Sequence, residues 1–254
     1  SGLASAERYD PATDTWTRIA NMPGTRCGHA AVALGPFLYV IGGFLYNNGG
    51  VSATVLRYNP ALDVWTAVAN MPAALFCHAA VTVGGHIYVL GGRDQNFGAT
   101  NSVLRYDPAT DAWQAVANML TPRSCLAAAA CGDYIYAMGG QGPAGLLAAT
   151  ERYDVRRGVW EQVAAMPTAR CDLAAAASSA AGGERVEPHA ASNASGGIAQ
   201  PAGKKASPIR AAIEHAKEQQ STVGSFDDAK PIQLGGWSEH QGGVPQSVRD
   251  LPRS

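Results

Sequence analysis

The sequence predicts an all-β fold made of a repeated four-stranded unit, and three recurring landmarks carry that prediction. A tyrosine returns about every 48 residues, a tryptophan follows each tyrosine after a short turn, and a glycine pair closes an apolar run before the tyrosine. The landmarks are Tyr9, Tyr58, Tyr106 and Tyr153; Trp16, Trp65, Trp113 and Trp160; and the pairs 42–43, 91–92 and 139–140. Because all three keep one register, the chain is an internal repeat.

The first unit to appear is a half-unit, residues 1–22, with one strand ending at Tyr9 and another beginning at Trp16. The turn between them reads Asp-Pro-Ala-Thr-Asp, in which proline fixes φ and the aspartates accept hydrogen bonds from nearby backbone N–H groups. Related turns recur at residues 59–63 and 107–111. The turn at 154–158 has lost the proline and gained Gly158.

Three complete units follow, at about residues 23–71, 72–119 and 120–166. In each, the first strand is small and apolar, and the second is bulky and ends in the glycine pair. The third carries the tyrosine and the fourth the tryptophan. The glycines let backbones approach closely and φ become positive. The two aromatic residues are expected to pack between neighbouring sheets, since one sheet cannot bury its own faces.

After residue 166 the pattern fades. A fragment at 167–177 supplies one more first strand, and no second strand is expected where Glu184 to His189 stand. Residues 178–254 are rich in Ala, Ser, Gly, Pro and Gln and have no sustained period, which predicts a mostly disordered tail. Within it, Ser207 and Pro208 mark the start of a short helix over 208–220. The predicted domains are therefore 1–177 and 178–254.

The composition limits the classes of partner that the protein is expected to bind. The formal net charge is −1 over 254 residues, so there is no electrostatic reason to expect nucleic acid or an anionic membrane surface. No apolar run approaches the roughly 18 residues that a membrane span needs. The five cysteines, an odd number without close pairing, favour a reducing compartment and hence a cytoplasmic or nuclear location.

The paired glycines, the tyrosine and the tryptophan at a period of about 50 resemble the kelch repeat, one blade of a β-propeller. The resemblance covers residues 1–177 and implies a partial kelch propeller with three complete blades and two fragments. Related rings have five to seven blades, closed by strands from the two chain ends. An arc left open would expose strand edges, so we expect self-association through them.

The resemblance also implies a binding mouth formed by loops at one end of the blades. Kelch-like adaptors bind acidic peptides there with an arginine four residues after the methionine of each repeat, which corresponds to Arg26, Arg123 and Arg170, with Leu75 breaking the series. The alternative is that these arginines hold blades together. The remaining candidates line the loops: Phe44, Arg93 and Gln141 after the glycine pairs, Asn101 at a loop end, and Tyr46, Asn47, Asn48, Gln95, Asn96 and Phe97 as adaptable contacts.

Two sets of residues could hold a metal but have a simpler interpretation. Cys27, Cys77, Cys125 and Cys171 lie at or next to one repeat position, either as small buried side chains or as an axial metal cluster. His29 and His78 recur one repeat apart, as packing residues or as a two-residue metal site. We expect packing in both cases, and no cofactor.

The predicted function is a non-enzymatic protein-interaction module, without catalytic residues. It resembles the substrate-recognition region of BTB-kelch adaptors, which deliver bound proteins to a cullin ubiquitin ligase through separate BTB and BACK regions. The adaptor role is therefore implied by the resemblance alone. Two other classes stay open: a propeller enzyme or sugar-binding protein, similar to the epimerases or oxidases built on kelch blades, and an actin-binding kelch protein.

Overall fold

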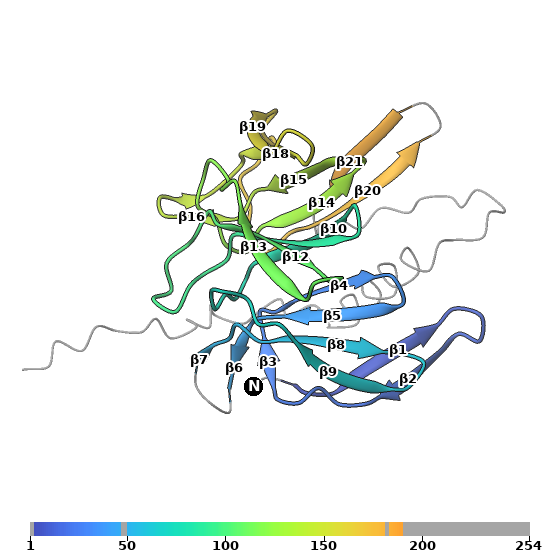
Figure 1. Cartoon of the computed structure of the whole chain (residues 1–254). Helices are drawn as coiled ribbons and strands as arrows, with labels where there is room; N and C mark the ends of the chain where they lie inside the picture. Colours follow the sequence, from blue (N-terminus) through green and yellow to red (C-terminus); the bar gives the residue numbers. More distant parts are fainter. Residues whose placement is uncertain (1–2, 47–49, 181–182, 190–254) are drawn as a thin grey trace, which may run out of the picture. The chain divides into compact units, whose positions relative to one another are not determined.

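The structure, a computed structural model, describes residues 3–46, 50–180 and 183–189 (Figure 1). All of them belong to the first of the two units into which the chain divides, Ser1–Pro201. The predicted helix at 208–220 and the rest of the predicted tail from residue 190 lie outside the described residues, as do the predicted loop contacts Asn47 and Asn48. Those predictions stay predictions.

Three four-stranded antiparallel sheets form the complete blades, and each follows the order of the sequence. The first blade contains β4 (Ala30–Leu34), β5 (Phe37–Ile41), β8 (Val55–Asn59) and β9 (Val64–Val68). The second contains β10 (Ala79–Val83), β11 (His86–Leu90), β12 (Val103–Asp107) and β13 (Ala112–Val116). The third contains β14 (Ala127–Cys131), β15 (Tyr134–Met138), β18 (Thr150–Asp154) and β19 (Val159–Val163). The all-β class and the repeated four-stranded unit are thus confirmed.

The N-terminal half-blade is the hairpin of β1 (Ala6–Asp10) and β2 (Thr15–Ile19), in which Tyr9 pairs with Trp16. The same tyrosine–tryptophan pairing recurs in every complete blade: Tyr58 with Trp65, Tyr106 with Trp113, and Tyr153 with Trp160. The rings of each pair lie about 5 Å apart, from 4.9 to 5.3 Å between centroids. The repeat register is therefore a cross-strand contact in three dimensions.

Polar side chains at the ends of the hairpin turns hold the backbone, and the residues differ from blade to blade. In the second blade, Asp107 Oδ1 accepts from the N–H of Ala109 at 2.9 Å, as the sequence predicted. Asp111 adopts a left-handed φ of 50° and accepts a hydrogen bond from the Tyr106 hydroxyl at 2.7 Å. In the third blade Gly158 occupies the second position, with φ 68°, so this turn lacks the carboxylate.

The core lies between the blades. One cluster joins the first and second blades, with Tyr39 and Ile41 packed against Ile87 and Tyr106. A second cluster joins the second and third blades through the corresponding residues. A four-stranded sheet can bury its faces only against a neighbouring sheet, so the repeat is stable as an array of neighbours.

Each glycine pair permits a close contact between blades. A Cβ at Gly91 would lie 2.4 Å from the carbonyl oxygen of Arg123, and Gly91 has φ 59°. The next residue, Gly92, donates its N–H to the same carbonyl oxygen at 2.9 Å. Only glycine fits at such a position, because any side chain would both strain the backbone and collide with it.

Short pairs of strands lie in the loops after two of the glycine pairs. In the first unit, one small three-stranded sheet is formed by β3 (Arg26–Cys27), β6 (Phe44–Leu45) and β7 (Gly50–Val51). In the third unit, β16 (Gln141–Gly142) pairs with β17 (Gly145–Leu146). These small sheets and their neighbours carry the predicted mouth residues.

The C-terminal fragment differs from the prediction. After β20 (Ala174–Ala180), the chain turns and forms β21 (Gly183–His189), which pairs antiparallel with β20. The expectation that no second strand follows residue 177 was wrong. Strand formation depends on the surface a segment packs on more than on its composition. Here Leu173 and Ala175 pack against Ala129 and Met138 of the third blade.

Within the described residues, no helix has the length and apolar character that crossing a bilayer would require.

Candidate functional site

The loops that follow the glycine pairs are placed alike by one repeated backbone contact. The residue after each pair bridges to the segment that precedes a small first strand: Phe44 to Cys27, Arg93 to Phe76, and Gln141 to Ser124. The three predicted residues Phe44, Arg93 and Gln141 therefore occupy equivalent positions on successive blades.

Arg93 and Gln141 are brought together across two blades. The Arg93 guanidinium donates from Nη2 to Gln141 Oε1 at 3.0 Å and from Nε to Ser124 Oγ at 3.2 Å. A longer contact of 3.5 Å joins its Nη1 to the carbonyl oxygen of Phe97. All three acceptors are neutral, and among the described residues Arg93 forms no ion pair. A half-buried positive charge is thus left without a carboxylate.

Beside Arg93 lies a cluster of four aromatic side chains. Phe44 is at its centre, with ring centroids 5.8 Å from Tyr46, 6.1 Å from Phe76 and 6.4 Å from Phe97. Phe76 and Phe97 meet edge to face at 5.6 Å. Tyr46 and Phe97 remain 48% and 55% exposed, so this cluster is open to solvent on one side.

Phe97 is held in an unusual conformation, with φ 62°. A bulky residue in the left-handed region is an outlier that the surrounding structure must stabilise. Asp94 does so, because its carbonyl oxygen accepts from the Phe97 N–H at 3.0 Å and its Oδ1 accepts from the N–H groups of Asn96 and Gly98 at 2.9 and 3.1 Å. The loop therefore fixes an exposed aromatic side chain in place.

A second feature is a ladder of backbone hydrogen bonds that crosses the blades. Cys77 N–H donates to Gly28 O at 2.7 Å, Cys125 N–H to Cys77 O at 2.8 Å, and Asp172 N–H to Cys125 O at 2.9 Å. All four residues have φ between 51° and 58°. Burial raises the pKa of the Cys77 thiol, and it raises that of Cys125 to about 12, with nearby Cys77 and Asp172 adding to the shift.

These thiols stay protonated near neutral pH. All five cysteines are free, and in the described part of the chain no group of three or more His, Cys, Asp or Glu side chains is placed to hold a metal ion. Cys77 and Cys125 are half-buried and occupy left-handed positions of the ladder.

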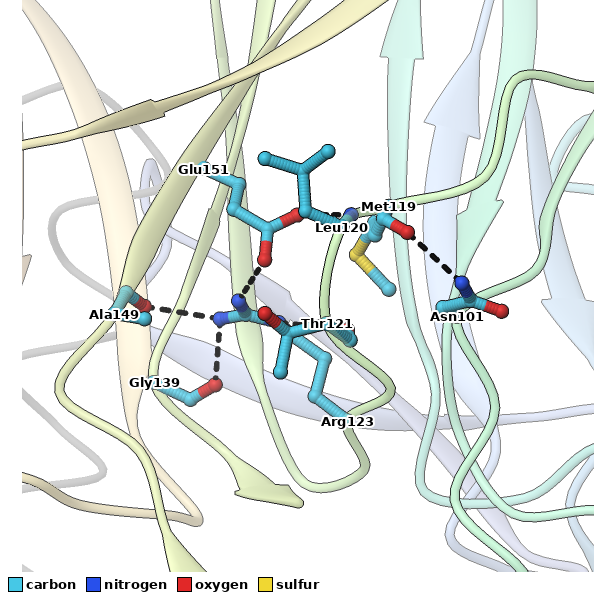
Figure 2. A network of polar contacts seen from close by, with 8 residues as sticks. All are labelled: Asn101, Met119, Leu120, Thr121, Arg123, Gly139, Ala149 and Glu151. Carbon is cyan, nitrogen blue, oxygen red and sulfur yellow. Dashed lines mark hydrogen bonds and ion pairs between the residues drawn. The ribbon is translucent and has the colours of Figure 1, made fainter. Parts of the chain in front are cut away.

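The predicted arginine mouth needs correction at two positions. Arg123 is fully buried, and Figure 2 shows its guanidinium surrounded by protein groups. Its Nη1 donates to the carbonyl oxygens of Gly139 and Ala149, each at 2.9 Å, and its Nη2 pairs with Glu151 Oε1 at 2.5 Å. Arg26 is 4% exposed and donates to Gly42 O at 3.0 Å. The guanidinium of Arg123 thus binds the third blade, while its carbonyl oxygen accepts from Gly92 N–H of the second blade, so the residue joins the two blades. The guanidinium of Arg26 binds the first blade at Gly42.

The Arg123 site extends toward the second blade. Glu151 Oε2 accepts from the Leu120 N–H at 2.7 Å, in the segment that joins the second blade to the third (Figure 2). Asn101 donates from Nδ2 to the carbonyl oxygen of the preceding residue in that segment, Met119, at 2.9 Å. The amide nitrogen of Asn101 is therefore engaged in joining the segment to the second blade.

The remaining predicted residues are spread along the loops. Arg170 is half-buried, and its carbonyl oxygen accepts from Gly140 N–H at 2.8 Å, as that of Arg123 does for Gly92. Gln95 and Asn96 are exposed on the loop that carries Phe97. The structure thus gathers Phe44, Tyr46, Arg93, Phe97 and Gln141 in one region.

The two histidines lie beside the glycine pairs, His29 at Gly43 and His78 at Gly42 and Gly92. His78 is 7% exposed, and neither ring nitrogen has a hydrogen-bond partner. Burial, and secondarily nearby His29, lowers the pKa of His78 to about 4. The pKa of His29 is also lowered, mainly by burial and then by Arg26. Neutral, packed imidazoles agree with the packing interpretation.

Two residues of this region were missed by sequence reasoning, Phe76 and Ser124. Each lies five residues after the methionine of its repeat. The corresponding residues are Cys27 before the first blade and Cys171 in the C-terminal fragment. The predicted arginine positions lie one residue earlier in the repeat. A signal was present, since Phe76 is the sole aromatic residue at this repeat position.

Comparison with known proteins decides the family. The model of the KLHDC2/KLHL20/DRC7 Kelch-repeats domain matches residues 28–186, and that of the Kelch motif matches residues 1–23. The chain belongs to the kelch-repeat family. The first match includes most of β21, in agreement with the second strand seen in the structure.

Among curated kelch proteins, Kelch-like protein 15 of Danio rerio is 48% identical over 46 residues, and Kelch-like protein 15 of Homo sapiens is 46% identical over 46 residues. Each match covers 18% of this chain and 8% of the relative. The similarity to these relatives is thus confined to a short segment of each.

Among solved structures, the one titled "Structure of YjhT" superposes with a TM-score of 0.60, covering 69% of both chains at 19% identity. At this identity the likeness shows the fold alone. Kelch domains generally mediate protein–protein binding.

Proposed function

We propose that the chain binds a protein partner, without catalysis, through the surface formed by Phe44, Tyr46, Phe76, Phe97 and Arg93, here called the aromatic surface. The observation that carries this proposal is Phe97, which is more than half exposed although a network around Asp94 holds it in a left-handed conformation. Backbone strain that positions an exposed aromatic residue has a use in binding, since aromatic anchors dominate protein interfaces.

The chemistry of this surface selects the kind of partner. Its aromatic faces suit a large apolar or aromatic side chain, and Arg93 beside them has only neutral hydrogen-bond partners among the described residues. A carboxylate from a partner would supply the missing counter-charge through the planar guanidinium. The expected ligand is therefore an acidic peptide segment with an apolar anchor. This keeps the predicted preference for acidic partners but moves it from Arg26 and Arg123 to Arg93.

Within the family, such a surface fits substrate or partner recognition of the kind that BTB-kelch adaptors perform. We place this activity in the cytoplasm or the nucleus, where five free thiols remain reduced.

The test uses the full chain against a displayed library of random peptides. Enriched peptides should contain Asp or Glu next to a large apolar residue. Phe97→Ala and Arg93→Ala should each weaken binding of a labelled, enriched peptide by about 2 kcal/mol, roughly 30-fold, as the loss of an interface anchor does.

Leu146→Ala is the matched control, because Leu146 is also 55% exposed but lies in β17. It should leave the affinity unchanged. Failure to enrich any peptide, or equal affinity of all three variants and the wild type, would rule out the aromatic surface.

A further inference from the structure

The blades are joined by one contact that repeats three times. The tryptophan of each complete blade donates its indole N–H to an alanine carbonyl of the preceding unit: Trp65 to Ala20 at 2.7 Å, Trp113 to Ala69 at 2.8 Å, and Trp160 to Ala117 at 2.9 Å. In the first two cases the N–H of the same alanine donates to the turn aspartate, Asp63 or Asp111, at 2.8 and 2.9 Å. We call this contact the alanine clasp.

The fourth alanine of this series is Ala164, directly after β19. It lies in a groove of about 340 Å³ on the third blade, lined also by Tyr136, Met138, Thr150, Val163 and Met166. Every lining residue of this groove comes from the third blade or from the segment immediately after it.

The equivalent residues of the first two blades are covered by the next blade along. Tyr39 and Tyr88, which correspond to Tyr136, are 1% and 2% exposed and lie near Tyr106 and Tyr153 respectively. Tyr136 is only half-buried. The groove is thus the acceptor half of the alanine clasp, and what fits it is a hairpin with a tyrosine, a turn aspartate and a tryptophan.

Such a hairpin exists at the other end of the chain. In β1–β2, Tyr9, Asp14 and Trp16 occupy the same repeat positions as Tyr58, Asp63 and Trp65. The turn geometry is the same, since Asp14 has φ 55° and accepts from the Tyr9 hydroxyl at 2.7 Å. Trp16 is 50% exposed.

The strand pairing points to the same match. In the described structure β1–β2 and β20–β21 are each two-stranded sheets, whereas every complete blade has four strands. The pair β20–β21 supplies the first and second strands of a blade beside β14, and β1–β2 has the third and fourth. Together they would make one complete sheet in the order β20, β21, β1, β2.

We propose that the groove on the third blade binds the β1–β2 hairpin of a second copy of this chain, with Trp16 and Asp14 of that copy closing an alanine clasp on Ala164. A second copy is the occupant because, in the described structure, no residue of the chain's own β1–β2 hairpin lines the groove. Reciprocal exchange gives two copies six complete and two composite blades, a total within the four to eight of known propellers.

Light scattering on the full chain is the first test. The wild type should have twice the mass of one chain at micromolar concentration. Ala164→Glu should raise the dimer dissociation constant at least about ten-fold, because Ala164 is exposed and the new carboxylate would face that of Asp14. Trp16→Ala should do the same from the donor side. Leu62→Glu, at a position 68% exposed in the turn of the first blade, is the control and should remain dimeric.

Mixing the two variants distinguishes hairpin exchange from non-specific self-association. An equal mixture of Ala164→Glu and Trp16→Ala chains contains one intact groove and one intact hairpin, so dimers should reappear. If Trp16→Ala melts early by circular dichroism, Trp16→Phe replaces it as donor variant, since it keeps an aromatic ring beside Tyr9 but has no indole N–H to donate.

Three results would overturn the proposal: a wild-type monomer at every concentration, as when other residues of the same chain cover the groove; a dimer that survives both substitutions; or a mixture that stays monomeric.

Discussion

The second and third blades fill the same buried position in opposite ways. The third blade holds the ion pair of Arg123 and Glu151, with both side chains at most 1% exposed. The second blade has Leu75 and Leu104 at the equivalent positions, 1% and 4% exposed and in one apolar cluster. Yet the backbone contact is identical, since Leu75 O accepts from Gly43 N–H at 2.8 Å and Arg123 O from Gly92 N–H at 2.9 Å.

The difference shows that this position requires buried volume and a backbone carbonyl, and that charge there is optional. A buried ion pair and a well-packed apolar pair are often close in stability. The recurrence of arginine in the sequence is therefore a packing solution, shared by two blades and replaced in one.

The largest effect expected from this comparison is that of breaking the ion pair. Glu151→Ala should lower the free energy of unfolding by about 3–5 kcal/mol, because Arg123 would be left buried without a counter-charge and the Leu120 N–H would lose its acceptor. Urea denaturation followed by tryptophan fluorescence measures this loss.

The double variant Arg123→Leu with Glu151→Leu copies the second blade and serves as the control. Its unfolding free energy should recover to within about 1–2 kcal/mol of the wild type, or exceed it. A double variant as unstable as Glu151→Ala would mean that the two blades are not equivalent at this position.

A second expected effect concerns His78, which lies next to Gly42 together with Leu75, the leucine that replaces arginine before the second blade. Its native pKa of about 4 lies below the ordinary value of 6.5, so between these values the unfolded state binds more protons. The contribution of neutral His78 to the free energy of unfolding is therefore full above pH 6.5. It falls by about 3 kcal/mol as the pH drops toward 4.

His78→Leu, which copies Leu126 of the third blade, should flatten this pH dependence in urea melts at pH 4.5 and 7. An unchanged slope in the variant would show that other groups cause the acid sensitivity.

The smallest effect concerns a carboxylate that the third blade lacks. Gly158→Asp should add about 1 kcal/mol of stability, as a modest net hydrogen-bond gain does, because the new side chain would lie near the Tyr153 hydroxyl and the Ala117 N–H. Asp63 and Asp111 adopt left-handed φ values of 52° and 50° in their own turns, near the 68° of Gly158. Gly158→Ala, with the same backbone strain and no carboxylate, is the control and should destabilise.

The sequence alone determined the local pattern of this protein. The spacing of Tyr106, Trp113 and the glycine pair at 91–92 predicted strands, turns and close backbone contacts, since each follows from a residue and its near neighbours in the chain. The three complete blades and the loop position of Arg93 and Phe97 followed from the same register.

The tertiary structure alone decided which side chains face inward. Arg123 and Arg93 look alike in the sequence, but Arg123 is buried because the adjoining strand supplies Glu151, and Arg93 keeps a half-exposed charge because Ser124 and Gln141 are neutral. The strand β21 likewise has no strand pattern of its own and forms where β20 offers a backbone to pair with. Burial and pairing depend on what another blade places nearby, and no local period records that.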